Sequence, residues 1–150
     1  MKRRISFVLA LLFILFAESH AQNPGKQGEN TMETKIVLKA NGITIPATLN
    51  DTVAAKDFRT RLPFTVSGYR SSVDYCCTAS SGAYDPKETQ AGWKNGDINL
   101  GGGWFAVLFD GEESSKSYTE MMIIGHIDEE HLHLVKGLPN NVTFTVELAE

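Results

Sequence analysis

Residues 35–49 read KIVLKANGITIPATL, and this stretch predicts a β-hairpin. Apolar side chains recur at every second position on both sides of Asn41-Gly42, a dipeptide that accepts the positive φ angles of a tight type I′ turn. Pro46 has no backbone N–H to donate, so its strand is expected to be an edge strand or to carry a bulge there. The chain is therefore expected to build an antiparallel sheet with one buried face.

The sequence beyond this hairpin predicts further short strands and two short helices. Strand patterns cover residues 64–69, 73–78, 97–100, 104–109, 117–127 and 142–148. The first helix is expected to be capped by Asp51 or Thr52 and to end at Pro63. The second helix is expected to begin at Asp128 and to close at Gly137. These elements describe a β-barrel or a β-sandwich, and a closed barrel would leave no exposed sheet edge.

The first 21 residues have the three parts of a secretory signal peptide. A basic start is followed by the apolar run 5–16 and by the small-x-small cleavage signal Ser19-His20-Ala21. Cleavage is expected after Ala21, with Ala17 as the lesser option. A retained membrane anchor is the alternative, although the apolar run is shorter than the roughly 20 residues that span a bilayer. The protein is therefore expected to be exported, either to a periplasm or to the outside.

Residues 22–34 carry a different pattern from the rest of the chain. Asn23-Pro24-Gly25 is followed by polar residues with almost nothing to bury, which is typical of a flexible linker. The organisation is expected to be a signal peptide over residues 1–21, a linker over residues 22–34 and one folded domain over residues 35–150.

The charge of the chain excludes some classes of partner. Loss of residues 1–21 would remove three positive charges and one negative charge, which changes the formal net charge from −4 to −6. An acidic protein repels phosphate groups, so neither nucleic acid nor, after signal cleavage, a membrane surface is an expected partner. The mature protein is expected to be a monomer.

The only two cysteines, Cys76 and Cys77, are adjacent. Neighbouring side chains on a strand point to opposite faces, so one thiol is expected in the core and the other outside. A disulfide between these neighbours is the alternative, and it would need an unusual turn.

Four short motifs in the second half of the domain occur in a particular order. They are Gly96-Asp97-Ile98-Asn99-Leu100, Val107-Leu108-Phe109, Ser117-Tyr118 and Ile124-Gly125-His126-Ile127-Asp128. In order and spacing they resemble the small cyclophilin-like family of prokaryotes, in which arginine is more usual at the place of His126. The resemblance covers nearly the whole mature domain. It implies a mainly β fold, a closed cyclophilin-like β-barrel of about eight strands with two short helices.

The resemblance does not extend to the residues of prolyl isomerase chemistry. Catalytic cyclophilins place a Phe-Met-x-Gln-Gly-Gly-Asp-Phe run beside their groove and an arginine several residues earlier. When the two are aligned on Gly96-Asp97, Lys94 stands at the glutamine and the arginine position falls near Pro86, yet residues 71–150 contain no arginine. The enzyme must lower a barrier of about 18–20 kcal/mol with a positioned donor, and a lysine is a flexible point charge rather than a planar fork. We therefore expect no catalytic residues in this chain.

Seven residues are candidates for a ligand-binding groove: Tyr75, Trp93, Lys94, Phe109, Tyr118, Met121 and His126. Aromatic side chains with a polar tip suit binding surfaces, and methionine offers a deformable apolar contact. For Trp104 and Phe109, a simple core position is the preferred interpretation. No cofactor is expected, and His126, His131 and His133 do not have the spacing of a known metal site.

The preferred hypothesis is an exported, non-catalytic domain that binds a peptide or a small-molecule ligand in a shallow groove. The first alternative is a weak peptidyl-prolyl isomerase or folding helper. The second is a structural module whose exposed sheet edge near Pro46 pairs with another protein.

Overall fold

The computed structural model describes residues 33–150. The predicted signal peptide and almost all of the predicted linker lie outside the described residues, whereas Thr34, the last linker residue, already belongs to the first strand. Within this described part, no helix has the length and apolar character needed to cross a membrane.

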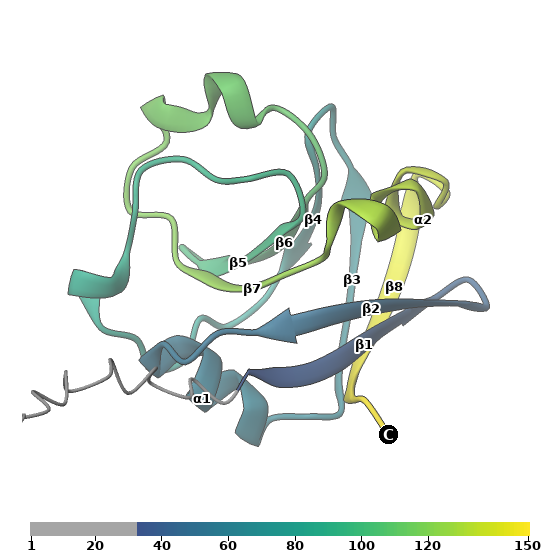
Figure 1. The fold of residues 1–150 in the computed structure, drawn as a ribbon, viewed down its shortest axis with the longest axis horizontal. Coiled ribbons are helices and arrows are strands. Elements are labelled where there is room, and N and C mark those ends of the chain that lie inside the picture. The colour runs from purple at the N-terminus through teal and green to yellow at the C-terminus, as the bar shows by residue number, and fades with distance from the viewer. Residues whose placement is uncertain (1–32) are drawn as a thin grey trace, which may run out of the picture. The chain divides into compact units, whose positions relative to one another are not determined.

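Eight antiparallel strands close into a barrel, as the sequence predicts (Figure 1). Their order around the barrel is β1-β2-β7-β5-β6-β4-β3-β8. Strand β8 returns to pair with β1, and there the N–H of Ala149 donates to the carbonyl of Lys35 at 3.0 Å. The strands are β1 (Thr34–Ala40), β2 (Ile43–Leu49), β3 (Phe64–Arg70), β4 (Asp74–Thr78), β5 (Asp97–Gly101), β6 (Trp104–Leu108), β7 (Ile123–His126) and β8 (Asn141–Leu148).

The β1–β2 hairpin forms around the predicted turn. Asn41 and Gly42 have φ angles of 53° and 76°, which is the backbone that a type I′ turn requires. Pro46 faces Val37. Counted from the turn, this is a non-hydrogen-bonded pair, so the proline nitrogen points away from β1. On that side β2 pairs with β7 only at its last two residues, which confirms the local edge position predicted for Pro46.

Helix α1 (Val53–Thr60) begins at the predicted cap. The side chain of Thr52 accepts the N–H of Ala55 at 3.1 Å. Phe58 is fully buried, with its ring centroid 5.0 Å from that of Phe64 and 5.8 Å from that of Phe105. Because eight residues make only a marginal helix alone, packing against the sheet stabilises this element.

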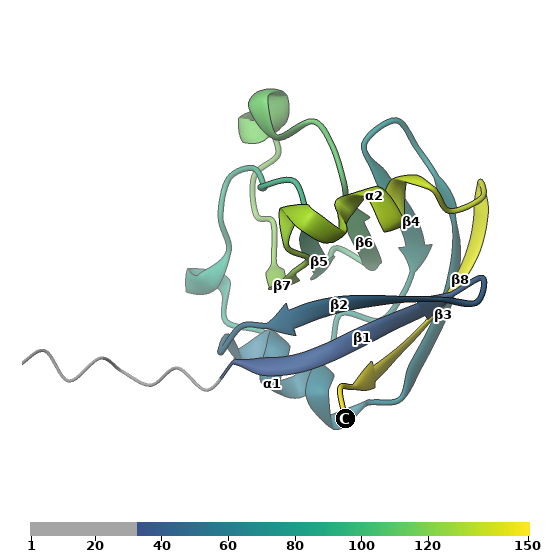
Figure 2. The same ribbon diagram turned by 45° about the vertical axis from the view of Figure 1, so that its right-hand side comes forward.

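Helix α2 (Leu132–Lys136) follows a single 3-10 turn, η3 (Glu129–His131). Asp128 occupies the N-cap position as predicted, although its side chain makes no capping hydrogen bond. Figures 1 and 2 show α1 and α2 on opposite sides of the β1–β2 hairpin, and α2 lies against β2.

The segment predicted as a strand over residues 117–127 is strand only from Ile123 onward. The chain before it forms the 3-10 helix η2 (Glu112–Ser117) and then a turn in which Glu120 has a φ of 60°. A single bridge links Met121 to Gln90. This part of the prediction is wrong because the segment leaves the barrel and runs over the outer face of the sheet.

The barrel interior holds an aromatic core that includes Phe109, for which a core position is preferred, and Tyr75, which is predicted to line a groove. Tyr75 is fully buried, and its hydroxyl donates to the carbonyl of Leu138 at 2.7 Å. The guanidinium of Arg70 lies 4.7 Å from the ring centroid of Phe109 and donates to the carbonyl of Lys136. Tyr75 and Phe109 thus belong to the core.

The two cysteines lie on opposite faces of β4, as predicted. Cys77 is buried in the core, Cys76 faces outward, and both are free thiols.

The Gly-Asp motif joins neighbouring strands. Gly96 has a φ of 106°, and a side chain there would collide with the carbonyl of Ile127. Asp97 is buried, and its carboxylate accepts the N–H of Lys94 at 2.8 Å and pairs with Nδ1 of His126 at 2.8 Å. The motif therefore fixes β5 against β7.

Candidate functional site

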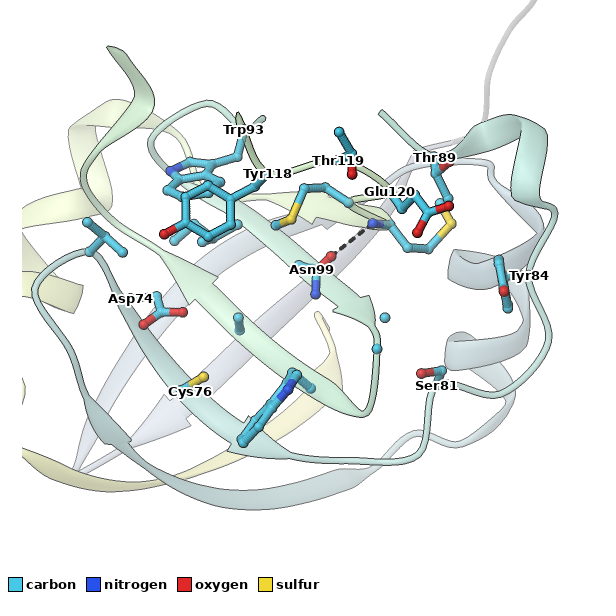
Figure 3. Close-up of a pocket in the computed structure, with 18 of the residues that line it drawn as sticks. Asp74, Cys76, Ser81, Tyr84, Thr89, Trp93, Asn99, Tyr118, Thr119 and Glu120 are labelled. Atoms are coloured by element: carbon cyan, nitrogen blue, oxygen red, sulfur yellow. Dashed lines mark hydrogen bonds between the residues drawn. The ribbon is translucent and has the colours of Figure 1, made fainter. Parts of the chain in front are cut away.

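A groove lies on the outer face of the barrel, over strands β4, β5 and β6 (Figure 3). Its volume is about 820 Å³, within the roughly 300–1,000 Å³ of known ligand pockets. Alternate residues of the strands face outward and form its floor. The strand residues that line it are Asp74, Cys76, Asn99, Gly101, Trp104, Ala106 and Leu108. The loop residues include Tyr84, Trp93, Tyr118, Glu120, Met121 and Met122.

Along β6 the floor of the groove is apolar. Ala106 and Leu108 are buried together with Trp93 in a small cluster that is separate from the barrel core. At the start of the same strand, Trp104 keeps 42% of its surface exposed. This face of the strand is therefore buried at Ala106 and Leu108, whereas the core position preferred for Trp104 is wrong.

Hydrogen bonds fix one aromatic wall in place. The indole Nε1–H of Trp93 donates to the carbonyl of Asp110 at 2.8 Å, and its backbone N–H donates to the buried Oγ of Ser115 at 3.0 Å. The ring of Tyr118 lies 5.2 Å from that of Trp93, centroid to centroid, at an angle of 55°. Two loops that are distant in sequence thus hold a joint aromatic surface.

Asn99 provides the one buried amide of the floor. Its side chain is turned so that Oδ1 accepts the N–H of Met122 at 2.9 Å, as the dashed line in Figure 3 shows. Only 6% of the residue is exposed. Among residues 33–150, its Nδ2 group has no hydrogen-bond acceptor, so the free N–H donors face the groove. A ligand carbonyl placed there would satisfy them.

The charged residues of the groove are both acidic. Asp74 lies on the floor and Glu120 at the rim, and in the view of Figure 3 they flank Asn99. Burial, together with the charge of Asp74 and a hydrogen bond to it, raises the pKa of the Cys76 thiol to about 11. Cys76 is thus a protonated, weakly nucleophilic group at neutral pH.

All three arginines of the described part lie away from the groove. The guanidinium of Arg70 is held over Phe109. Arg61 pairs with Asp57 at 3.4 Å and donates to the carbonyl of Ser80. Arg59 reaches Thr34. None of these three arginines lines the groove.

The seven sequence-predicted site residues are divided between three places. The structure brings Trp93, Tyr118 and Met121 together in the groove. Tyr75 and Phe109 lie in the core instead, because their positions along the chain face the barrel interior. Lys94 and His126 lie outside the groove.

The groove residues that sequence reasoning missed include Asp74, Tyr84, Asn99, Trp104 and Glu120. The alternation of side chains along a strand could have identified two of them. Trp104 shares a face with Ala106 and Leu108, and Asn99 stands between the core residues Ile98 and Leu100 and so faces outward. Nothing in the local pattern identifies Glu120.

His126 lines a second, smaller hollow with Asp97, Asp128 and Lys35. Its hydrogen bond to Asp97 raises the pKa of the imidazole, against the opposing effect of burial. No group of three or more potential metal ligands occurs in the described residues.

Comparison with known proteins identifies the fold family. The sequence profile of the cyclophilin-like family matches residues 38–147. The chain belongs to the cyclophilin-like family. Its cyclophilin-like barrel also resembles the solution structure of a hypothetical protein from Archaeoglobus fulgidus, with a TM-score of 0.63 and 15% sequence identity over 81% of this chain and 99% of that one. At this identity the likeness concerns the fold alone. No curated protein matches the chain.

Proposed function

We propose that this chain is an exported cyclophilin-like domain that holds a peptide or small-molecule ligand in its groove without catalysing a reaction. One observation carries the proposal. The groove combines an apolar strip along β6, aromatic walls and, at Asn99, an amide donor that opens to the groove without an acceptor among residues 33–150. Such a mixture of apolar surface and a few polar groups is typical of ligand sites.

The side chains that line the groove favour binding over catalysis. Among residues 33–150, no lysine or arginine borders it, and its thiol is protonated at neutral pH. The side-chain donors that a twisted amide would meet are neutral: the Nδ2–H groups of Asn99, hydroxyls at the rim and the indole of Trp104, since the indole N–H of Trp93 already donates to Asp110. Binding needs no more than these groups, whereas isomerisation needs a strong donor aimed at the reacting bond.

Intrinsic fluorescence tests binding directly, since both tryptophans of the chain line the groove. Titration with short proline peptides is expected to change the emission and to raise the melting temperature. Trp104→Ala should weaken binding about ten-fold, because aromatic anchors dominate such surfaces. Tyr69→Ala removes an exposed aromatic side chain elsewhere and serves as the control. Equal affinities of the two variants, or no response to any peptide, would contradict the proposal.

A weak prolyl isomerase is the second candidate, and Asn99 is the observation that favours it. Its free Nδ2–H groups could donate to an amide in the groove. An isomerase assay with a proline tetrapeptide should compare wild type, Asn99→Ala and, as a control outside the groove, Lys94→Ala. Turnover that disappears only in Asn99→Ala would replace the binding proposal with the enzyme.

Export is supported by the leader pattern of residues 1–21. N-terminal sequencing of the protein recovered from outside the cytoplasm is expected to start at Gln22. Recovery of the uncleaved chain in the cytoplasm alone would contradict export.

A further inference from the structure

We propose that the groove selects a peptide segment that carries a lysine or arginine side chain. This inference rests on the proposed binding function and names the chemistry of the ligand. It follows from the charge of the groove, from its exposed aromatic faces and from one unsatisfied amide.

The charge of the groove has a single sign. Of the residues that line it, Asp74 and Glu120 are charged, and no lysine, arginine or histidine of the described residues joins them. Elsewhere in the domain carboxylates do find cations, for example Glu147 with Lys39 at 2.6 Å. Neither groove carboxylate forms an ion pair within residues 33–150. A cation on the ligand would therefore meet two carboxylates without a cationic partner among residues 33–150. Glu120 is exposed, whereas Asp74 is half-buried and accepts the hydroxyl of Ser71, so the attraction to Asp74 is less screened by water.

The aromatic side chains add a second attraction for cations. Tyr84, Trp104 and Tyr118 are exposed by 51%, 42% and 58%, and all three line the groove. Large aromatic faces left open to solvent are uncommon unless they bind something. Ammonium and guanidinium groups bind such faces by cation–π attraction, most strongly on tryptophan. A groove with acidic and aromatic lining favours a cation over a neutral or anionic side chain.

Asn99 indicates a second chemical group of the ligand, a hydrogen-bond acceptor. Its Nδ2 group opens to the groove and has no acceptor among residues 33–150, so a ligand carbonyl placed there gains a hydrogen bond from it. The carbonyl of a peptide bond supplies that acceptor, and a free amine or metal ion does not. The groove thus offers a site for a backbone carbonyl between two sites for positive charge (Figure 3).

The backbone at the rim supports a role for Glu120. Its φ of 60° lies in the left-handed region, where residues other than glycine or asparagine are uncommon. A glycine would fit this turn with less strain. A strained residue at the edge of a groove points to a requirement for its side chain, here the carboxylate.

Three peptides that differ in one side chain test the proposal: acetyl-Ala-Lys-Pro-Phe-amide and its norleucine and glutamate analogues. Tryptophan fluorescence gives the three dissociation constants at low salt. The lysine peptide is expected to bind about ten-fold tighter than the norleucine peptide and more tightly still than the glutamate peptide. The advantage should shrink at high salt.

Two double variants locate the charge that is responsible. Asp74→Asn with Glu120→Gln should bring the lysine and norleucine peptides to similar affinities. Asp51→Asn with Glu129→Gln changes the net charge equally at exposed sites outside the groove and should keep the ranking. The single variant Glu120→Gln provides the same test if replacement of Asp74 impairs folding.

The possible failures are distinguishable. Equal binding of all three peptides would overturn selection for cations and leave the binding function intact. A ranking that survives in the groove double variant would also overturn it. No binding of any peptide would overturn the proposed function itself.

Discussion

At the residue scale, the face of a strand on which a side chain lies decides its environment, as Cys76 and Cys77 show. Cys76 opens into the groove, whereas Cys77 is sealed in the core, where burial raises the pKa of its thiol to about 12. Two identical, adjacent side chains therefore have different environments.

The first prediction concerns the reactivity of Cys76. Because its pKa is about 11, little thiolate exists at pH 8, and iodoacetamide should label it at least about ten-fold more slowly than free cysteine. Asp74→Asn should speed labelling, though only in part, since burial is the largest cause of the raised pKa. Mass spectrometry of the Cys77→Ala background measures both rates. Labelling as fast as that of free cysteine would contradict the description of this site.

The second prediction concerns the strained backbone of Glu120. Glycine at this position is expected to raise the free energy of unfolding by about 0.5–1 kcal/mol, because it adopts a positive φ without steric cost. Glu120→Ala is the control, since it removes the carboxylate and keeps the strain. Urea denaturation of the three proteins measures the effect, and a glycine variant less stable than the alanine variant would contradict it.

Single residues were the hardest part of the site to predict from sequence. Tyr75 and Trp104 are both aromatic residues in strands, and only the register of each strand decides that Tyr75 faces the core and Trp104 the groove. A shift of one residue reverses the face. The groove position of Glu120 could not be predicted, because it depends on a turn that is stabilised by contacts with a distant loop.

At the scale of elements, the Asp97–His126 pair joins β5 to β7 directly. These two residues belong to two of the motifs on which the resemblance to the family rests, and both of them have a structural role outside the groove. The alternating strands and Asn41-Gly42 were predictable because their signals are local. The segment 117–122 was not predictable in this way, because its apolar residues Tyr118 and Met121 cover the outer face of the sheet and join no strand pair.

The third prediction follows from the titration of this pair. The hydrogen bond to Asp97 raises the pKa of His126 above its ordinary value of 6.5, so the folded protein holds this proton more tightly than the unfolded chain. The resulting stabilisation is fully present below about pH 6.5 and is lost as the pH rises through the folded-state pKa.

The variant His126→Arg provides the comparison. Arginine keeps its charge throughout this range. Between pH 6 and pH 8 the denaturation midpoint of the variant should therefore fall less than that of the wild type. The difference should equal the stabilisation that the wild type loses when His126 gives up its proton. Chemical denaturation at several pH values measures the difference. The same pH dependence in both proteins would show that the pair does not stabilise the fold through this proton.

At the scale of the whole barrel, the closure between β2 and β7 is the shortest of the strand pairings. Only Thr48 with His126 and Leu49 with Gly125 are paired there. Gly125 permits the close approach, because a Cβ on it would lie 2.6 Å from the carbonyl oxygen of Thr48.

The fourth prediction tests this closure. Gly125→Ala is expected to lower the free energy of unfolding by about 1–3 kcal/mol, since the added methyl group must push two backbones apart. Gly137→Ala is the matched control, because the nearest atom to its added methyl group is 3.4 Å away. Equal losses in the two variants, measured by urea denaturation, would show that the closure tolerates the extra volume.

The hydrogen bond between Ala149 and Lys35 places the first and last strands of the domain next to each other at their outer ends. A fusion partner would consequently be attached to the same region of the barrel whether it is joined to the first or to the last strand. A short linker could also connect the two ends into a circular permutant, with new termini opened at the Asn41-Gly42 turn.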